Sequence, residues 1–423
     1  MKLRWRIAFL IGVAIAISYL DRQTVSVAIA AIQREIPISN AQFSTLQALF
    51  LVAYAAMYVG GGRLLDALGT RRGFVLIMVW WSLACAAHGL ATGFFTLALC
   101  RFMLGIGEGG GFPAATKAVA EWFPTQERSM AMGIINGGTA IGAVAAPPLI
   151  AFIILFAGWR WVFFAVGAVG LIWTLWWSRE YFLPATHPKL TKNEREEIRE
   201  VFSQENETGP SISWFRLFSF IEVWGLVIAK FLSDAAWYFY LFWLPKYLYD
   251  VRGFDVKKVG YYAWIPYAAA GIGCIVGGWF SGWLIKRGKS LDFARKMALG
   301  ASAAVMPSIL VVPHVGVQWA IVVFSIAFFG QQSWSTLVMI VPTDLFPKRI
   351  VASVAGLVGF GGAIGGVIFN LVVGYLLTNG FGYATVFGIV SMFHVAAFCL
   401  ILVTVRRVRP LIVSHKEMSL TQA

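Results

Sequence analysis

Apolar runs of about 20 residues recur along this chain, and they constrain its fold more than any other feature. A run of this length crosses a hydrocarbon core of about 30 Å as a single α-helix. The alternating short segments of a membrane β-barrel are not seen. We therefore expect an all-α membrane protein with twelve transmembrane helices, near 7–31, 43–65, 73–93, 96–118, 129–156, 160–178, 221–249, 260–285, 296–313, 317–341, 350–377 and 382–405.

The first apolar run resembles a signal peptide, because basic residues precede it and an AxA-like AIA follows at 28–30. Eleven further runs and the charged pair Asp21 and Arg22 inside this one favour a retained first helix. The net charge of +14 fits the same picture. Most Lys and Arg residues fall on the cytoplasmic side if both termini are cytoplasmic, which is the positive-inside bias. They are scattered over several loops, so nucleic-acid binding is not expected.

The cysteines and histidines indicate neither a disulfide framework nor a metal site. No CxxC spacing occurs, and the five histidines lie in separate segments. A membrane enzyme would need a cluster of such residues, and a channel would suit a repeated pore signature. We therefore expect a transporter without a cofactor. The four cysteines all fall inside predicted spans, at Cys85, Cys100, Cys274 and Cys399.

The chain repeats itself around its one long polar stretch, at 178–216, which we interpret as a cytoplasmic linker with a short surface helix near 191–203. The segment EWFPTQERSMAMGIINGGTAIGA at 121–143 aligns without gaps on DLFPKRIVASVAGLVGFGGAIGG at 344–366. Such duplication predicts two pseudo-symmetric six-helix bundles, the architecture of secondary transporters with a midplane site. The expected boundaries are 1–178 and 221–405 for the bundles, 179–220 for the linker and 406–423 for a cytoplasmic tail.

The stretch GGRLLDALGTRRG closely resembles the loop signature of the major facilitator superfamily. In that family the acid contacts a neighbouring helix end and the basic residues help to gate the inward and outward states. The alternative is a plain tight, charged loop. A degraded echo, GGWFSGWLIKRG, follows the eighth span with Gly282 at the acidic position, so weaker gating contacts are expected there. The signature positions are Gly62, Asp66, Gly69, Arg71 and Arg72.

Six ionisable residues lie inside predicted spans and away from the span ends, where each costs about 2.5 to 3.5 kcal/mol on insertion scales unless it has a partner or a water-filled cavity. Arg101 and Glu108 are seven residues apart, so they share a helix face but are about 10 Å apart along the axis. They either face a common cavity, as an anion partner and a titrating acid, or Arg101 extends to a surface while Glu108 bonds to another helix. The six are Asp21, Arg22, Arg101, Glu108, Lys230 and Asp234.

A GxGxxG match at Gly105, Gly107 and Gly110 is not interpreted as a nucleotide loop, because it lies inside an apolar helix without a preceding strand. Close backbone packing is the expected role. In the seventh span Lys230 and Asp234 are four apart and are expected to form an intrahelical pair. The aromatic residues that follow, Trp237 and Tyr238 among them, line a sugar site or belong to an interfacial girdle.

With these residues in view, the chain resembles the hexuronate transporters of the anion:cation symporter family. The similarity runs from YLDRQTVS through RFMLGIGEGGGFPAATKAVAEWFPTQERS, WYFYLFWLPKYL and QQSWSTLVMIVPTDLFP to the eleventh span. It implies proton-coupled import of a sugar acid by alternating access. Close relatives carry galactonate or glucarate on the same motifs, so those anions remain alternatives. A drug antiporter is a weaker one, because two arginines in spans favour an anionic substrate.

The resemblance also implies roles for individual residues. Arg22 matches the arginine that binds the substrate carboxylate. Asp21 and Glu108 match the acids that carry protons, without indicating which dominates, and Arg101 matches an arginine that modulates them. The positions matched to substrate binding are Tyr19, Arg22, Tyr54, Trp237, Tyr238, Trp334, Ser335 and Asn370.

Two positions depart from the family pattern. Gln331 stands where relatives often have His, and Ala235 replaces a frequent Pro, so either residue can retune specificity. The expected partners are a small organic anion, protons and the lipid bilayer. The expected protein is a monomer in the inner membrane of a bacterium, with both termini in the cytoplasm.

Overall fold

The computed structural model describes residues 2–123, 125–197, 217–346 and 348–409, and the side chains of 59, 62–63, 66, 125–126, 128–130, 192 and 348–353 lie outside this description. Every regular element in the described ranges is a helix. This is the expected outcome for a chain of apolar runs, since a helix satisfies all its backbone hydrogen bonds internally. The predicted all-α class is confirmed.

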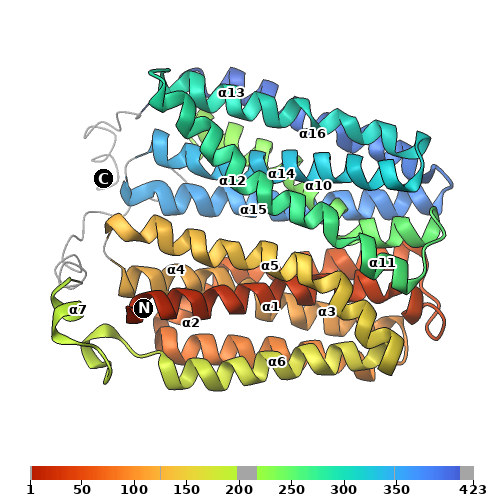
Figure 1. Cartoon of the computed structure of the whole chain (residues 1–423), viewed down its shortest axis with the longest axis horizontal. Helices are drawn as coiled ribbons and strands as arrows, with labels where there is room; N and C mark the ends of the chain where they lie inside the picture. Colours follow the sequence, from red (N-terminus) through yellow and green to blue (C-terminus); the bar gives the residue numbers. More distant parts are fainter. Residues whose placement is uncertain (1, 124, 198–216, 347, 410–423) are drawn as a thin grey trace, which may run out of the picture. The chain divides into compact units, whose positions relative to one another are not determined.

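The described residues of the first half form six long or medium helices and a short linker helix (Figure 1). Short 3-10 turns follow α2 at His88–Leu90 and precede the linker helix at Pro184–Thr186. The helices are α1 (Leu3–Ile32), α2 (Asn40–Ala87), α3 (Phe94–Gly109), α4 (Gly111–Trp122), α5 (Thr125–Ala157), α6 (Trp159–Glu180) and α7 (Lys192–Glu197).

The second half repeats this series of long helices. A 3-10 stretch, Met306–His314, follows α13. The helices are α10 (Ile221–Asp250), α11 (Val256–Tyr262), α12 (Trp264–Lys286), α13 (Leu291–Ala304), α14 (Val317–Leu345), α15 (Lys348–Thr378) and α16 (Gly382–Thr404).

Ten helices among the described residues are long and apolar enough to cross a membrane. The two other predicted spans correspond to the first half of α2 and to the α3–α4 pair. α2 runs through the predicted loop with a kink at Gly69, whose φ of 75° is the left-handed conformation that glycine adopts readily. The α3–α4 pair breaks at Gly110 into pieces of 16 and 12 residues, which carry Arg101 and Glu108.

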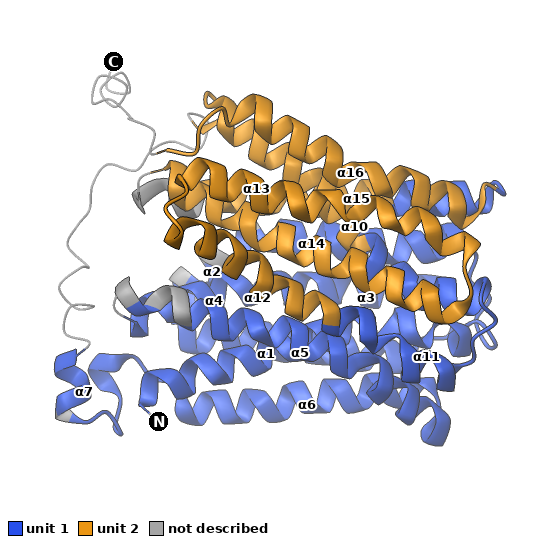
Figure 2. Ribbon diagram, turned by 45° about the horizontal axis from the view of Figure 1, so that its top comes forward, with its two compact units in different colours: residues 1–208, 239–268, 370–380 blue, residues 209–238, 269–369, 381–423 orange. Residues whose placement is uncertain are grey.

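The chain forms two compact units, coloured separately in Figure 2. Unit 1 comprises Met1–Thr208, Phe239–Ala268 and Asn370–Gly380, and unit 2 comprises Gly209–Tyr238, Ala269–Phe369 and Phe381–Ala423. The end of α10 belongs to unit 1 because its aromatic side chains pack there. Trp243 meets the ring of Phe43 edge-on at 4.9 Å, and the Tyr249 hydroxyl donates to the Val27 carbonyl at 2.6 Å. The predicted boundaries at 178 and 221 remain a prediction.

Glycines bring paired helices into backbone contact in the same way in each unit. In unit 1, Gly138 of α5 lies against the Gly12 carbonyl of α1, and Gly142 lies against that of Ala16. In unit 2, Gly361 and Gly365 of α15 lie against Val227 and Phe231 of α10. The two glycine pairs occupy matching positions in the gapless alignment of 121–143 with 344–366. The internal repeat of the sequence is therefore also a repeat of helix packing.

Gly138→Ala is expected to destabilise the protein by about 1–3 kcal/mol, because the added methyl group overlaps the Gly12 backbone. Gly137→Ala is the matched control, since a methyl group there meets open space and alanine is the better helix former. Thermal unfolding of the purified variants in detergent checks this. Equal melting temperatures for the two variants would contradict the close-packing interpretation.

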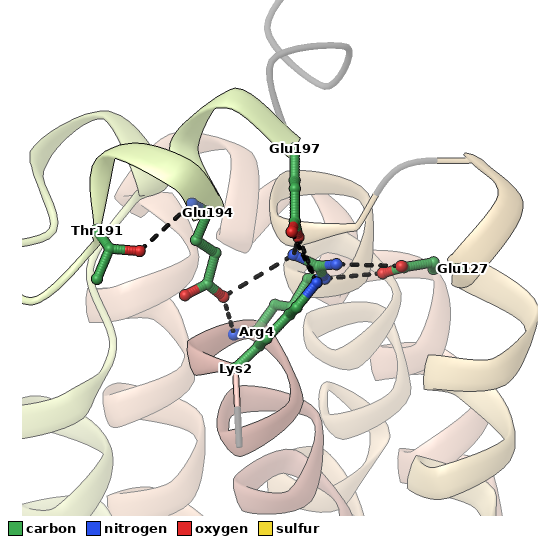
Figure 3. A network of polar contacts seen from close by, with 6 residues as sticks. All are labelled: Lys2, Arg4, Glu127, Thr191, Glu194 and Glu197. Atoms are coloured by element: carbon green, nitrogen blue, oxygen red, sulfur yellow. Dashed lines mark hydrogen bonds and ion pairs between the residues drawn. The ribbon is translucent and has the colours of Figure 1, made fainter.

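The linker helix α7 is held against the start of α1 by a network of charges (Figure 3). The Arg4 side chain is only 3% exposed and donates to Glu127 at 2.8 Å and to Glu197 at 2.9 Å. Glu194 accepts a hydrogen bond from the Arg4 backbone at 3.2 Å. Hydrogen bonds from Lys2 and Arg4 lower the pKa of Glu197. α7 covers the start of the helix predicted at 191–203, and the rest of that prediction, 198–203, lies outside the described residues.

Arg4→Gln should loosen α7, since one buried guanidinium joins it to α1 and α5. A loss of about 1 kcal/mol corresponds to about fivefold faster amide exchange across 192–197. Lys2→Gln is the control, because the Lys2 side chain is half exposed and an exposed ion pair contributes little. Hydrogen–deuterium exchange with peptide resolution measures both. Unchanged exchange in Arg4→Gln would show that α7 is held by other contacts.

Candidate functional site

A buried ion pair joins α1 to α3 in unit 1. The Arg22 Nε atom donates to Oε2 of Glu108 at 2.8 Å, and the Ser18 hydroxyl donates to the same oxygen at 2.6 Å. Both charged side chains are at most 2% exposed. The second carboxylate oxygen, Oε1, has no hydrogen-bond partner among the described residues. The pair thus satisfies one oxygen of Glu108 and leaves the other as a buried, unfilled acceptor.

Aromatic rings surround the guanidinium of Arg22. Its central carbon lies 4.7 Å from the ring centroid of Tyr19, 4.6 Å from that of Tyr54 and 5.7 Å from that of Phe50. The ring faces stabilise the cation without neutralising it. The structure therefore brings together three of the predicted substrate-binding residues, Tyr19, Arg22 and Tyr54, and adds Phe50, which the sequence reasoning did not select.

Asp21 turns away from Arg22 and contacts the second half of α2. The indole N–H of Trp81 donates to Oδ2 at 2.5 Å, and the Cys85 thiol lies 3.1 Å from Oδ1. Neither Trp81 nor Cys85 was among the site residues predicted from the sequence. Their spacing of four residues, which places both on one helix face, was the available signal. Asp21 and Glu108 therefore have separate sets of donors, although both acids are buried in unit 1.

Arg101 is fully buried, so the alternative in which it extends to a surface does not apply. It donates to the side-chain oxygen of Gln47 through a short hydrogen bond, and its guanidinium lies 4.9 Å from the ring centroid of Phe50. Its Nε and Nη1 atoms have no hydrogen-bond partner among the described residues. Arg101 thus keeps two buried donors that an anion or water can occupy.

The glycine stretch of α3 makes this arrangement possible. Gly105 and Gly109 lie against the carbonyls of Phe50 and Tyr54, so α3 approaches α2 closely beside the rings that face Arg22. Gly107 lies against Trp81, the donor to Asp21. The glycines therefore serve helix packing, as their helical context predicted, and they form no loop that could hold a phosphate.

In unit 2 the predicted intrahelical pair of α10 is formed. The Lys230 ammonium lies 2.8 Å from Oδ1 of Asp234 and donates to the Ser335 hydroxyl of α14 at 2.9 Å. A methyl group at Gly362 of α15 would overlap the Asp234 carboxylate, so glycine is needed there. Three helices thus meet at a single ion pair.

The other predicted substrate-binding residues are dispersed. Trp237 and Tyr238 are each 7% exposed, and Trp237 contacts the ring of Phe328 at 5.9 Å. Trp334 is buried in the apolar cluster of unit 2, edge-on to His394 at 5.5 Å. Asn370 belongs to unit 1, where its side-chain oxygen accepts a hydrogen bond from another indole, that of Trp243, at 2.8 Å.

The predicted gating segment is partly described. Gly69 provides the kink of α2, and Arg71 donates to the Ser178 carbonyl at 2.5 Å and covers the ring of Phe182 at 3.9 Å. Arg72 is exposed. The side-chain surroundings of Gly62 and Asp66 lie outside the described residues.

The two matching acids of the repeat, Glu121 and Asp344, make different contacts. Glu121 accepts hydrogen bonds from Thr70 and Tyr181. In unit 2, Arg295 pairs with Asp344 at 2.7 Å and donates to Ser281, the neighbour of Gly282, at 2.9 Å. The second copy of the loop therefore keeps polar contacts through a serine and an arginine, without an acid of its own.

No group of three or more His, Cys, Asp or Glu side chains converges within the described part of the chain in a way that could hold a metal ion. The buried groups of the described residues include carboxylates, guanidinium groups, the ammonium groups of Lys230 and Lys246, and aromatic rings. Guanidinium and ammonium groups can bind the carboxylate of an organic anion, and carboxylates can bind a proton.

Comparison with known proteins agrees with these features. Residues 11–370 match the model of the Major Facilitator Superfamily. The chain is 33% identical to the hexuronate transporter of Escherichia coli K12, over 98% of this chain and 96% of that one. It is also 33% identical to the galacturonate transporter of Dickeya chrysanthemi, over 72% of this chain and 89% of that one.

A solved structure shows the same fold. It is an inward-facing, occupied form of a bacterial homologue of the human lysosomal transporter Spinster, with a TM-score of 0.72, 18% identity and 96% coverage of both chains. The named relatives are transporters rather than enzymes. The chain therefore belongs to the Major Facilitator Superfamily of multi-pass membrane transporters.

Proposed function

We propose that this protein is a proton-coupled importer of a sugar acid, a hexuronate such as glucuronate or galacturonate, that works by alternating access. The buried Arg22–Glu108 pair is the observation that carries the proposal. It places a carboxylate-binding cation in direct contact with an acid that can take a proton. The names of the hexuronate and galacturonate relatives support the choice of substrate.

Competition for Arg22 provides the coupling. An ionised Glu108 holds the guanidinium, and a substrate carboxylate needs the same donors. A proton on Glu108 removes the negative charge that competes, so Arg22 becomes the partner of the incoming carboxylate. Release of that proton restores the internal pair and favours release of the substrate. Arg22 suits this exchange because its planar fork binds a carboxylate through two parallel hydrogen bonds.

Asp21 is the second candidate for the coupling acid. Its donors are an indole N–H and a thiol. Both donors are neutral, so neither of these two contacts pairs Asp21 with a cation. We assign to Arg101, which is buried in the same unit, the role of modulating both acids. Two acids with different donors can act at separate steps of one cycle.

The sugar hydroxyls require polar groups near Arg22. In unit 1 we assign this role to Tyr19 and Tyr54, whose rings already flank the guanidinium. In unit 2 the same role falls to Trp237, Tyr238, Trp334 and Ser335, and Asn370 completes the set. Trp334 and Asn370 are fully buried in this structure, so their contact with a sugar needs a change of conformation.

The remaining expectations follow from this function. We propose that the protein is a monomer in the bacterial inner membrane with both termini in the cytoplasm, and that Gly62, Asp66, Gly69, Arg71 and Arg72 take part in gating. Galactonate and glucarate remain alternative substrates. A drug antiporter is disfavoured because the buried cations of unit 1 select an anion.

Arg22→Lys is expected to reduce sugar-acid binding by at least about tenfold, because an ammonium lacks the planar fork and the broad face that the tyrosine rings cover. Arg22→Ala should abolish binding. Thermal-shift titration of the purified variants with galacturonate and glucuronate measures this, and size-exclusion profiles show whether they remain folded. Wild-type affinity in a folded Arg22→Ala would remove Arg22 from the substrate site.

Glu108→Gln tests the coupling, because glutamine imitates the protonated acid at nearly the same volume. Counterflow exchange of labelled galacturonate in proteoliposomes should persist, since exchange needs only the loaded carrier. Accumulation driven by a pH gradient should be lost, since net uptake needs a proton to be bound and released. Asp21→Asn in the same assay shows which acid dominates. Intact accumulation in Glu108→Gln would exclude Glu108 as the coupling acid.

A further inference from the structure

The Lys230–Asp234 pair of unit 2 has a feature that a purely structural pair does not need. Its side chains remain 8% and 13% exposed, although α10 is a membrane-spanning helix by length and composition. The pair is therefore not completely enclosed by protein, although its charges are largely buried.

The contacts of the pair connect it with the proposed substrate site. Lys230 donates to the hydroxyl of Ser335, a residue to which we assign sugar binding. Trp237 and Tyr238 follow Asp234 at the next turn of α10. An ammonium within hydrogen-bond distance of a sugar-binding hydroxyl would reach a second carboxylate of the substrate, if its own counter-ion were removed.

Asp234 is held firmly as that counter-ion. It lies one helical turn from Lys230, with 2.8 Å between the charged atoms, and the glycine at 362 leaves room for its carboxylate. The pair as a whole is neutral. A second carboxylate arriving at Lys230 would have to displace Asp234 and leave that acid buried without a partner, which is unfavourable.

We propose that the Lys230–Asp234 pair is a valence filter, which makes the transporter select sugar acids with one carboxylate over aldarates with two. This inference rests on the proposed function and narrows its substrate class. In unit 1 the buried cations Arg22 and Arg101 are balanced by Asp21 and Glu108, so one bound proton leaves charge for one carboxylate. Unit 2 adds no further net charge as long as Asp234 holds Lys230.

The test uses two probes with the same carbon skeleton and stereochemistry. Galacturonate carries one carboxylate, and galactarate carries a second in place of the aldehyde. Competition of each with labelled galacturonate uptake gives their relative affinities. The wild type should prefer galacturonate by at least about tenfold, the ratio expected for one unmade charge-assisted hydrogen bond.

Asp234→Asn should shift this ratio toward galactarate by at least about tenfold, because Lys230 becomes available to the second carboxylate. The double variant Lys230→Gln/Asp234→Asn should return to the wild-type preference, since the pair is again neutral. Lys230→Gln alone leaves Asp234 negative and should disfavour galactarate further, which keeps the test valid if Asp234→Asn fails to fold. Any variant that moves the ratio against these directions overturns the filter.

Asp250→Asn is the matched control. Asp250 pairs with Lys246 at 2.7 Å with the same spacing on the same helix, near its end. This variant should leave the galacturonate-to-galactarate ratio unchanged, and a shift equal to that of Asp234→Asn would show that the effect is not specific. Equal uptake of both probes by the wild type overturns the filter while the sugar-acid function stands. Transport of neither sugar acid overturns the proposed function itself.

Discussion

The cost of placing charge in an apolar solvent governs the organisation of this protein. A carboxylate and a guanidinium inside a helical bundle persist only when each satisfies the other or faces water. Glu108 and Arg22 meet this condition through one shared oxygen, which Ser18 also contacts. Separating the two charges completely would be costly, whereas one proton on Glu108 would neutralise the acid and weaken its contact with Arg22. Under the proposed function, the stability of the bundle and its response to protons depend on the same contact.

Holding that contact requires backbones that approach closely, which explains the many glycines. α3 can bring Glu108 to Arg22 because Gly105 and Gly109 allow it to lie against the α2 backbone. Larger residues there would separate the helices and lengthen the ion pair. The GxGxxG stretch at 105–110 thus forms no nucleotide loop but contributes to the site, because its glycines determine where the Glu108 carboxylate lies.

Much of this could be predicted from the sequence, because apolar length, internal repetition and charge inside a span are local patterns. The Lys230–Asp234 pair follows from a spacing of four residues alone. Trp81, Gln47 and Phe50 were not predicted because their roles depend on which helix faces which. A tryptophan in an apolar run looks the same whether it faces lipid or donates to a buried acid.

The packing of α10 shows the same limit. Its aromatic run was correctly located, but periodicity cannot show that the helix contributes to both compact units, with Tyr238 in one and Phe239 in the other. The two copies also differ in which helix supplies the glycines of a close contact. Glycines of α3 contact α2 in unit 1, whereas Gly273 and Gly277 of α12 contact α14 in unit 2. Either helix of a pair can supply the small residue, so the sequence alone leaves its position open.

The duplicated architecture finally explains how the two units came to hold different charges. Matching glycines, Gly138 with Gly361 and Gly142 with Gly365, maintain the backbone contacts of both copies and carry no side-chain chemistry. The polar residues between them are therefore free to diverge without disturbing the fold. Unit 1 accordingly holds Asp21, Arg22, Arg101 and Glu108 inside its spans, whereas unit 2 holds the Lys230–Asp234 pair beside a hydroxyl.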